Sequence, residues 1–72
     1  MKIVLKVRFN STYPKFEKVL GSKYILYIPE PQTKDSENFI KELLSRKLGI
    51  IKEKISVIEI NQEGEWFFHI ED

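Results

Sequence analysis

Apolar and polar side chains alternate at the beginning of the chain. Residues 2–9 place Ile3, Leu5, Val7 and Phe9 on one side and mostly basic residues on the other. A period of two is typical of a strand that buries one face, so residues 2–9 are predicted to form a strand whose inner face meets a helix.

Residues 16–20 and 23–28 are predicted to form a hairpin, because Gly21-Ser22 between them places glycine where a tight two-residue turn needs it. The side chains of the returning strand alternate again. One side carries Tyr24, Leu26 and Ile28, and the other carries Ile25 and Tyr27. The prolines at positions 29 and 31 should end this strand and lead the chain across to a helix.

Residues 35–48 have the period of an amphipathic helix, with an ordinary solvated face opposite the apolar one. Asp35 is the expected N-cap, and Gly49 is the expected left-handed residue that ends the helix. The apolar face carries Ile40, Leu43, Leu44 and Leu48.

After a short turn over residues 52–54, residues 55–60 and 65–71 are predicted to form a last hairpin. Trp66, Phe68 and Ile70 should point inward, and Phe67 and His69 outward. The order β-β-β-α-β-β predicts an α+β fold, a two-layer sandwich. Its mostly antiparallel or mixed sheet of four to five strands would carry one main helix on one face, and residues 1–72 would form a single domain.

Composition and charge narrow the classes of function. The chain has no cysteine, so neither a disulfide nor a thiolate metal site is expected. No apolar run approaches a membrane span, which predicts a soluble, cytoplasmic protein without a membrane partner. Abundant Ile, Lys and Glu without alanine are typical of thermophile proteins, and of AT-rich genomes as well.

The net charge of +1 argues against a strong unspecific attraction to nucleic acid. Residues 1–23 nevertheless carry six basic side chains and one acidic one, Glu17, whereas residues 24–72 carry six basic and ten acidic ones. We expect the basic first strand to lie beside acidic later strands, because opposite charges favour cross-strand pairing.

The succession of elements also carries a family resemblance. It is borne by Leu5-Lys-Val-Arg8, the hairpin through Gly21, Pro29-Glu-Pro31, the helix end Leu44-Ser-Arg-Lys-Leu-Gly-Ile50, the segment Lys52 to Ile58, and Ile70. In these features the chain resembles the YggU-like family of small uncharacterised proteins over nearly its whole length. The resemblance implies a compact α+β fold in a cytoplasmic protein whose biochemical role is not established.

Two polar signatures of that family are missing. The helix start of the family typically reads Gly-Lys-Ala-Asn, where this chain has Lys34-Asp-Ser-Glu37 followed by Asn38. The last hairpin of the family has Gly and then Ser-Arg-x-Lys, where this chain has Ile60, Glu63, Gly64 and Trp66. The resemblance therefore implies the fold and no site.

Residues for catalysis are scarce. His69 is the only histidine, and although Glu71 shares its strand face, a surface role is favoured. The serines lack a glycine elbow, the three isolated glycines form no phosphate loop, and the acidic residues lack metal-ligand spacing. Glu59 and Glu65 are expected to face each other across the last hairpin as solvated carboxylates. The sequence predicts no enzyme, no cofactor and no metal.

The outer face of the sheet is the candidate binding surface. It is expected to gather Lys6, Arg8, Ile25, Tyr27, Phe67 and His69, together with Lys2 and Val4. Aromatic residues and arginine are enriched at protein interfaces, which favours an unknown protein partner or a homodimer. The same mixture also suits single-stranded RNA as the alternative. In a third interpretation, Tyr13 and Phe16 fold over this face and bury it.

Overall fold

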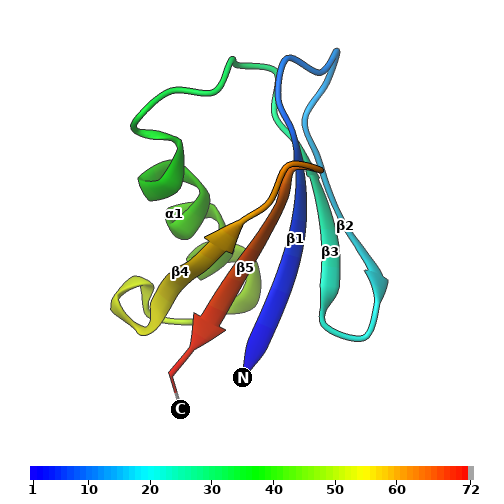
Figure 1. Cartoon of the computed structure of the whole chain (residues 1–72). Coiled ribbons are helices and arrows are strands. Elements are labelled where there is room, and N and C mark those ends of the chain that lie inside the picture. Colours follow the sequence, from blue (N-terminus) through cyan, green and yellow to red (C-terminus); the bar gives the residue numbers. More distant parts are fainter. Residues whose placement is uncertain (72) are drawn as a thin grey trace.

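A computed structural model describes residues 1–71 of the chain (Figure 1). The first half contains strands β1 (Lys2–Arg8), β2 (Lys15–Leu20) and β3 (Lys23–Tyr27). Helix α1 (Ser36–Leu48) and the short 3-10 helix η1 (Lys52–Lys54) follow, and then strands β4 (Ile55–Ile60) and β5 (Glu65–Ile70). This order confirms the predicted α+β sandwich.

The strands form one mixed sheet in the order β2-β3-β1-β5-β4. β1 pairs with β3 in parallel and with β5 in antiparallel fashion, and both hairpins are antiparallel. The chain leaves β1, passes the position of β3 to form the edge strand β2, and then returns as β3. Helix α1 afterwards carries it to the opposite edge, β4 (Figure 1).

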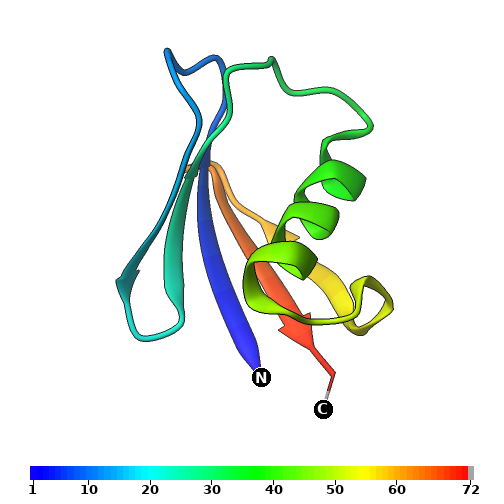
Figure 2. The same cartoon turned by 180° about the vertical axis from the view of Figure 1, so that it is seen from behind.

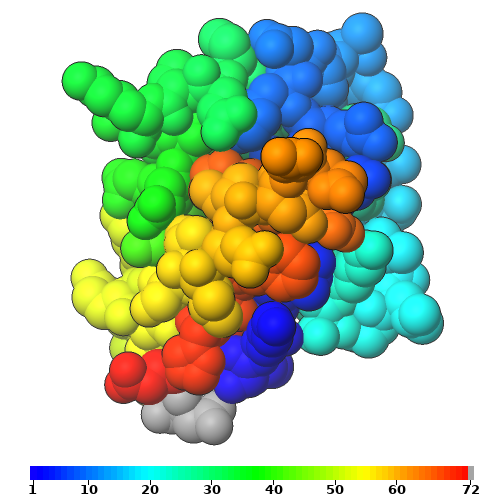
Figure 3. Space-filling view, viewed as in Figure 1, coloured from blue at the N-terminus to red at the C-terminus, as the bar shows by residue number. Residues whose placement is uncertain are grey.

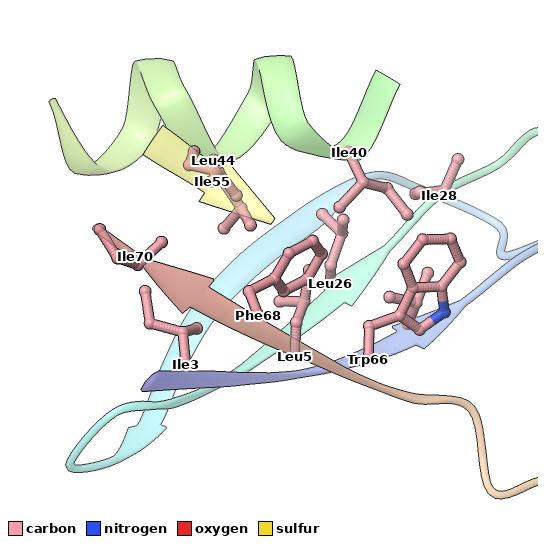
Figure 4. Packing of buried hydrophobic residues seen from close by; sticks show 11 residues of the cluster. Ile3, Leu5, Leu26, Ile28, Ile40, Leu44, Ile55, Trp66, Phe68 and Ile70 are labelled. Atoms are coloured by element: carbon pink, nitrogen blue, oxygen red, sulfur yellow. The ribbon is translucent and has the colours of Figure 1, made fainter. Parts of the chain in front are cut away.

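The hydrophobic core lies between α1 and the inner face of the sheet (Figure 4). Ile40 and Leu44 of α1 are fully buried there, as are Leu5 and Phe68 of the sheet. Trp66 also points into this interior and is 2% exposed. The predicted packing of the helix stripe on the inner residues of the first and last strands is therefore confirmed.

Both ends of α1 are where the sequence predicts them, but the N-terminal cap works differently. Asp35 occupies the N-cap position without a side-chain capping hydrogen bond. The turn before the helix is held instead by Ser36 Oγ, which accepts a hydrogen bond from the Thr33 amide at 2.8 Å. At the other end Gly49 adopts φ 68°, the left-handed conformation in which glycine avoids a steric penalty.

The last hairpin corrects one prediction. A register shift in β4 pairs Glu59 with Phe67, so Glu59 and Glu65 do not face each other. Glu65 lies opposite Asn61, whose amide N–H donates to the Glu65 carbonyl at 3.0 Å. Gly64, at φ 80°, lies close to β1, and its carbonyl accepts a hydrogen bond from the Val7 amide at 2.9 Å.

Helix α1 covers only part of the inner face. It lies on the β4 side of the sheet, and the β2–β3 hairpin extends away from it in both views (Figures 1 and 2). The turn of this hairpin projects from the body of the molecule (Figure 3), where Val19 and Leu20 are exposed. Within residues 1–71 the sheet thus has an outer face without a helix and an inner face that α1 covers in part.

Candidate functional site

All six residues predicted for the outer face lie on it. The parallel register places Lys6 beside Ile25 and Arg8 beside Tyr27. The antiparallel register places Phe67 beside Val4 and His69 beside Lys2. Because the intervening residues of β1 are buried against the helix, these side chains must point to the opposite side. The three central strands β3, β1 and β5 therefore present them on one surface.

The centre of this outer face is apolar but not bare. Val4 lies opposite Phe67 in the register, Ile25 lies one pair further along, opposite Lys6, and all three are half-buried. Lys2 Nζ lies 5.3 Å from the ring centroid of Phe67, so its stem and charge cover part of that ring. The surface is a mixture of apolar groups and cations rather than an open hydrophobic patch.

Two ion pairs neutralise part of the charge. Lys23 Nζ lies 3.4 Å from Glu65 Oε2, and Lys15 Nζ lies 3.6 Å from Glu17 Oε2. Glu65 is also placed beside Lys6 by the register, but it is the single acidic residue of β5. β3, the other neighbour of β1, is KYILY with no acidic residue, so the expected basic strand beside acidic strands is met at this one pair. In contrast, neither Lys6 nor Arg8 forms an ion pair with any residue between positions 1 and 71.

The pKa of the Glu65 carboxyl, on this face, is lowered from its ordinary value. A hydrogen bond from Asn61 Nδ2 to Glu65 Oε1, 2.9 Å long, is the main cause that lowers the pKa of this carboxyl. The neighbouring Lys23 and Lys6 lower it further, and partial desolvation opposes them. Glu65 is therefore anionic at neutral pH, and the outer-face lysines and arginine without an ion pair among residues 1–71 are Lys2, Lys6 and Arg8.

The aromatic residues lie at opposite corners of the face. Tyr27 of β3 lies opposite Arg8, and Phe67 of β5 lies opposite Val4. β3 and β5 flank β1 on its two sides. Two strand spacings across and four residues along give a Cα separation of about 16 Å. Lys6 and Arg8 lie on β1, the strand between the two that carry these rings.

The interpretation in which Tyr13 and Phe16 bury this face is wrong. Phe16 stacks on Tyr24 with 5.3 Å between ring centroids, and both rings belong to the inner side of the sheet. Tyr13 contacts Tyr27 at 6.1 Å and remains 52% exposed, so it touches the face only at one corner. The segment 10–20 continues into β2 at the edge of the sheet and leaves the outer face uncovered.

His69 lies on the outer face in an exposed position, opposite Lys2 and Ser56 on the neighbouring strands. It forms no ion pair within residues 1–71. In the same part of the chain, no three His, Asp or Glu side chains are grouped to hold a metal ion. No helix described there has the length and apolar character to cross a membrane.

A second surface was missed by the reasoning from sequence. A groove of about 520 Å³ runs between α1 and the β2–β3 hairpin on the inner side of the sheet. Leu26 and Ile28 form its floor, Phe16 lies on one wall, and Phe39 and Leu43 lie on the other. The signal for it in the sequence is Phe39, an aromatic residue beside the helix stripe, which the structure leaves 49% exposed.

No family model, curated protein or solved structure matches the chain. The resemblance to the YggU-like family therefore stays a prediction.

Proposed function

We propose that this protein is a non-enzymatic interaction module that binds an acidic surface of a protein partner through the outer face of its sheet. One observation carries this proposal: Lys6 and Arg8 stand without ion-pair partners among residues 1–71, beside a half-buried apolar centre. Arginine and aromatic side chains with an apolar centre are the composition of protein interfaces. Unpaired cations favour a partner of opposite charge.

A homodimer through this face is the less favourable form of the same proposal. In a two-fold symmetric contact the same patch of both copies meets itself. Lys6 and Arg8 of one copy would then approach the same cations of the other, and such like-charge contacts are costly. We therefore favour a different, acidic protein over a second copy of this chain.

The test is a selection of displayed random peptides against the wild-type protein, with counter-selection against the double variant Lys6→Glu, Arg8→Glu. The expected peptides combine acidic and apolar residues, and their titration shifts amide resonances of β1, β3 and β5. The matched control, Lys34→Glu with Lys54→Glu, makes the same charge change elsewhere. Peptides that bind the outer-face variant as well as the wild type would refute the proposal.

Single-stranded RNA is the second candidate, supported by the position of Lys6 and Arg8 between Tyr27 and Phe67. Proteins that bind single strands combine such cations with aromatic rings on which bases stack. Since Lys2 already lies over Phe67, a base would have to displace it there, whereas the ring paired with Tyr27 is the tilted, exposed Tyr13. Tyr27 is thus the better platform.

Fluorescence anisotropy with labelled single-stranded oligonucleotides at several salt concentrations tests this candidate. Binding should weaken as salt rises, because released counterions drive phosphate contacts. Tyr27→Ala should cost about 1–3 kcal/mol of binding free energy. Tyr24→Ala is the control on the inner side of the same strand, chosen to lie off the proposed binding face. A wild-type protein without salt-dependent binding would exclude RNA.

A further inference from the structure

The sheet is wider than helix α1, which covers part of its inner face. Five strands separated by about 4.8 Å span about 19 Å, whereas a helix with its side chains is about 10–12 Å across. Helix α1 lies toward β4, and the β2–β3 hairpin extends beyond it (Figure 2). The groove occupies the part of the inner face beside α1 where a second helix would complete the layer.

Apolar side chains stand on both walls of the groove. Phe39, Leu43 and Lys47 are spaced by four residues, so they form a second stripe on α1 next to the buried Ile40 and Leu44. Phe16 faces this stripe from β2. Parallel apolar walls above a buried floor are the kind of surface into which an amphipathic helix lays its apolar face.

An added strand is a poorer occupant than a helix. Pairing with the edge strand β2 would need a regular row of backbone groups, but the register shifts between Lys18 and Leu20. Pro14 precedes the strand, and Lys15 and Lys18 lie on it. Irregular register, proline and lysine are the features by which sheet edges resist further pairing.

The charges beside the groove favour an acidic occupant. One acidic residue, Glu30, lines the groove, and Lys15, which also lines it, is paired with Glu17. Three further cations lie around it: Lys47 lines it, Arg46 lines the adjoining hollow on α1, and Lys18 points to the inner side opposite Tyr24. None of these three cations has an ion-pair partner within residues 1–71. Glu42, in the same hollow, is already paired with Lys52 at 3.3 Å.

We infer that the groove between α1 and the β2–β3 hairpin binds an acidic amphipathic helix of a partner protein. Its apolar residues pack on Phe16, Phe39 and Leu43, and its acidic residues lie near Lys47 and Arg46. The groove lies on the inner side of the sheet, whereas Lys6 and Arg8 lie on the outer side, and the two surfaces meet at Lys15 and Tyr27, which also line the groove. Occupancy of the groove does not depend on the proposed function of the outer face.

The probe is a displayed library of helical peptides about 18 residues long, which is about five turns, randomised with Leu, Ala, Glu and Lys. Selection against the wild-type protein should enrich acidic peptides with leucines at a helical spacing. A selected peptide should become helical on binding and should shift amide resonances of α1, β2 and β3. A scrambled peptide of the same composition should not bind.

Phe39→Ser should weaken the selected peptide about tenfold or more, because truncating an aromatic anchor removes a large share of the binding energy. Lys47→Glu should weaken acidic peptides and strengthen their lysine-substituted counterparts. The matched control is Ile58→Ser, which removes a similarly exposed apolar side chain, 55% against 49%, at the opposite edge of the sheet. This control should leave binding unchanged.

Four results would overturn the inference: no enrichment of helical peptides, enrichment of extended ones, binding equally reduced by Ile58→Ser, or resonance shifts confined to the outer face. Light scattering of the protein alone measures its oligomeric state and so tests whether a second copy of the chain occupies the groove. A dimer that Phe39→Ser abolishes would place another copy of this chain in the groove and would also overturn it. If the groove binds no helix, the proposal for Lys6 and Arg8 still stands, because the peptide selection for the outer face uses other variants than the selection for the groove.

Discussion

Leu43 and Leu44 are neighbours on α1 but have different surroundings, so their alanine variants compare the two sides of the helix directly. Leu44 is fully buried in the core, at 0% exposure. Replacing such a leucine with alanine costs about 3–5 kcal/mol, through lost burial and the cavity that remains. Roughly 4–11 kcal/mol of unfolding free energy is typical for a domain of this length. Leu44→Ala should therefore remove a large part of the stability.

Leu43 is only half-buried and lines the groove, where its truncation leaves no enclosed cavity. We expect Leu43→Ala to cost about 1 kcal/mol or less. Urea denaturation followed by the fluorescence of Trp66, the only tryptophan, measures both. With a slope of about 1 kcal/mol per molar urea, the midpoint should fall by about 3 M or more for Leu44→Ala. It should fall by about 1 M or less for Leu43→Ala.

Equal losses for the two variants would refute this reasoning. They would mean that Leu43 is enclosed as fully as Leu44, so that α1 is rotated and the groove beside it is filled. A larger loss for Leu43 would mean the same. The comparison also decides whether Leu43 variants remain folded well enough to be used in binding experiments.

Further predictions concern the turns and the outer face. Gly64→Ala should lower the unfolding free energy by about 1–2 kcal/mol from the left-handed backbone alone. It should lower it further because the new Cβ would lie 3.2 Å from the Val7 carbonyl oxygen. Gly21→Ala is the control: its φ is also positive, at 56°, but its Cβ would meet nothing within 4 Å, so urea denaturation should show a smaller loss. Because the pKa of Glu65 is lowered in the folded protein, its stabilising contribution is present above the ordinary glutamate value of 4.5 and is lost as pH falls through the lower, folded value. The urea midpoint should therefore fall less on acidification in Glu65→Gln than in the wild type, and identical pH profiles would contradict this.

Most element boundaries could be predicted because each element buries one face and ends at a residue with special backbone geometry. Gly49 shows this, since an apolar helix stripe stops directly before the glycine that takes the left-handed conformation. The strand order could not be predicted in the same way. The parallel pairing of β1 with β3 depends on the path of residues 9–14 past β3, and no local period encodes that path.

The members of the outer face could be predicted from alternation alone, because a strand sends successive side chains to opposite sides. Which residues cover that face depends instead on which strands pair and in which register. Phe16 was a candidate cover, but its register opposite Leu26 turns it to the inner side. Likewise, the shift in β4 that separates Glu59 from Glu65 adds one residue to one strand, and the residue pattern does not reveal it.

The groove could not be found from the sequence because it arises from a mismatch between whole elements. It exists only because α1 lies toward β4 while the sheet extends to β2, and this requires the strand order. The β2–β3 hairpin then takes part in both candidate surfaces, with Tyr27 and Ile25 toward the outer face and Phe16 and Leu26 toward the groove. Adjacent residues of one hairpin thus serve opposite sides of the sheet. Because Tyr27 also lines the groove, the two binding activities are best separated by Lys6→Glu with Arg8→Glu on β1 and by Phe39→Ser on α1, each with its own control.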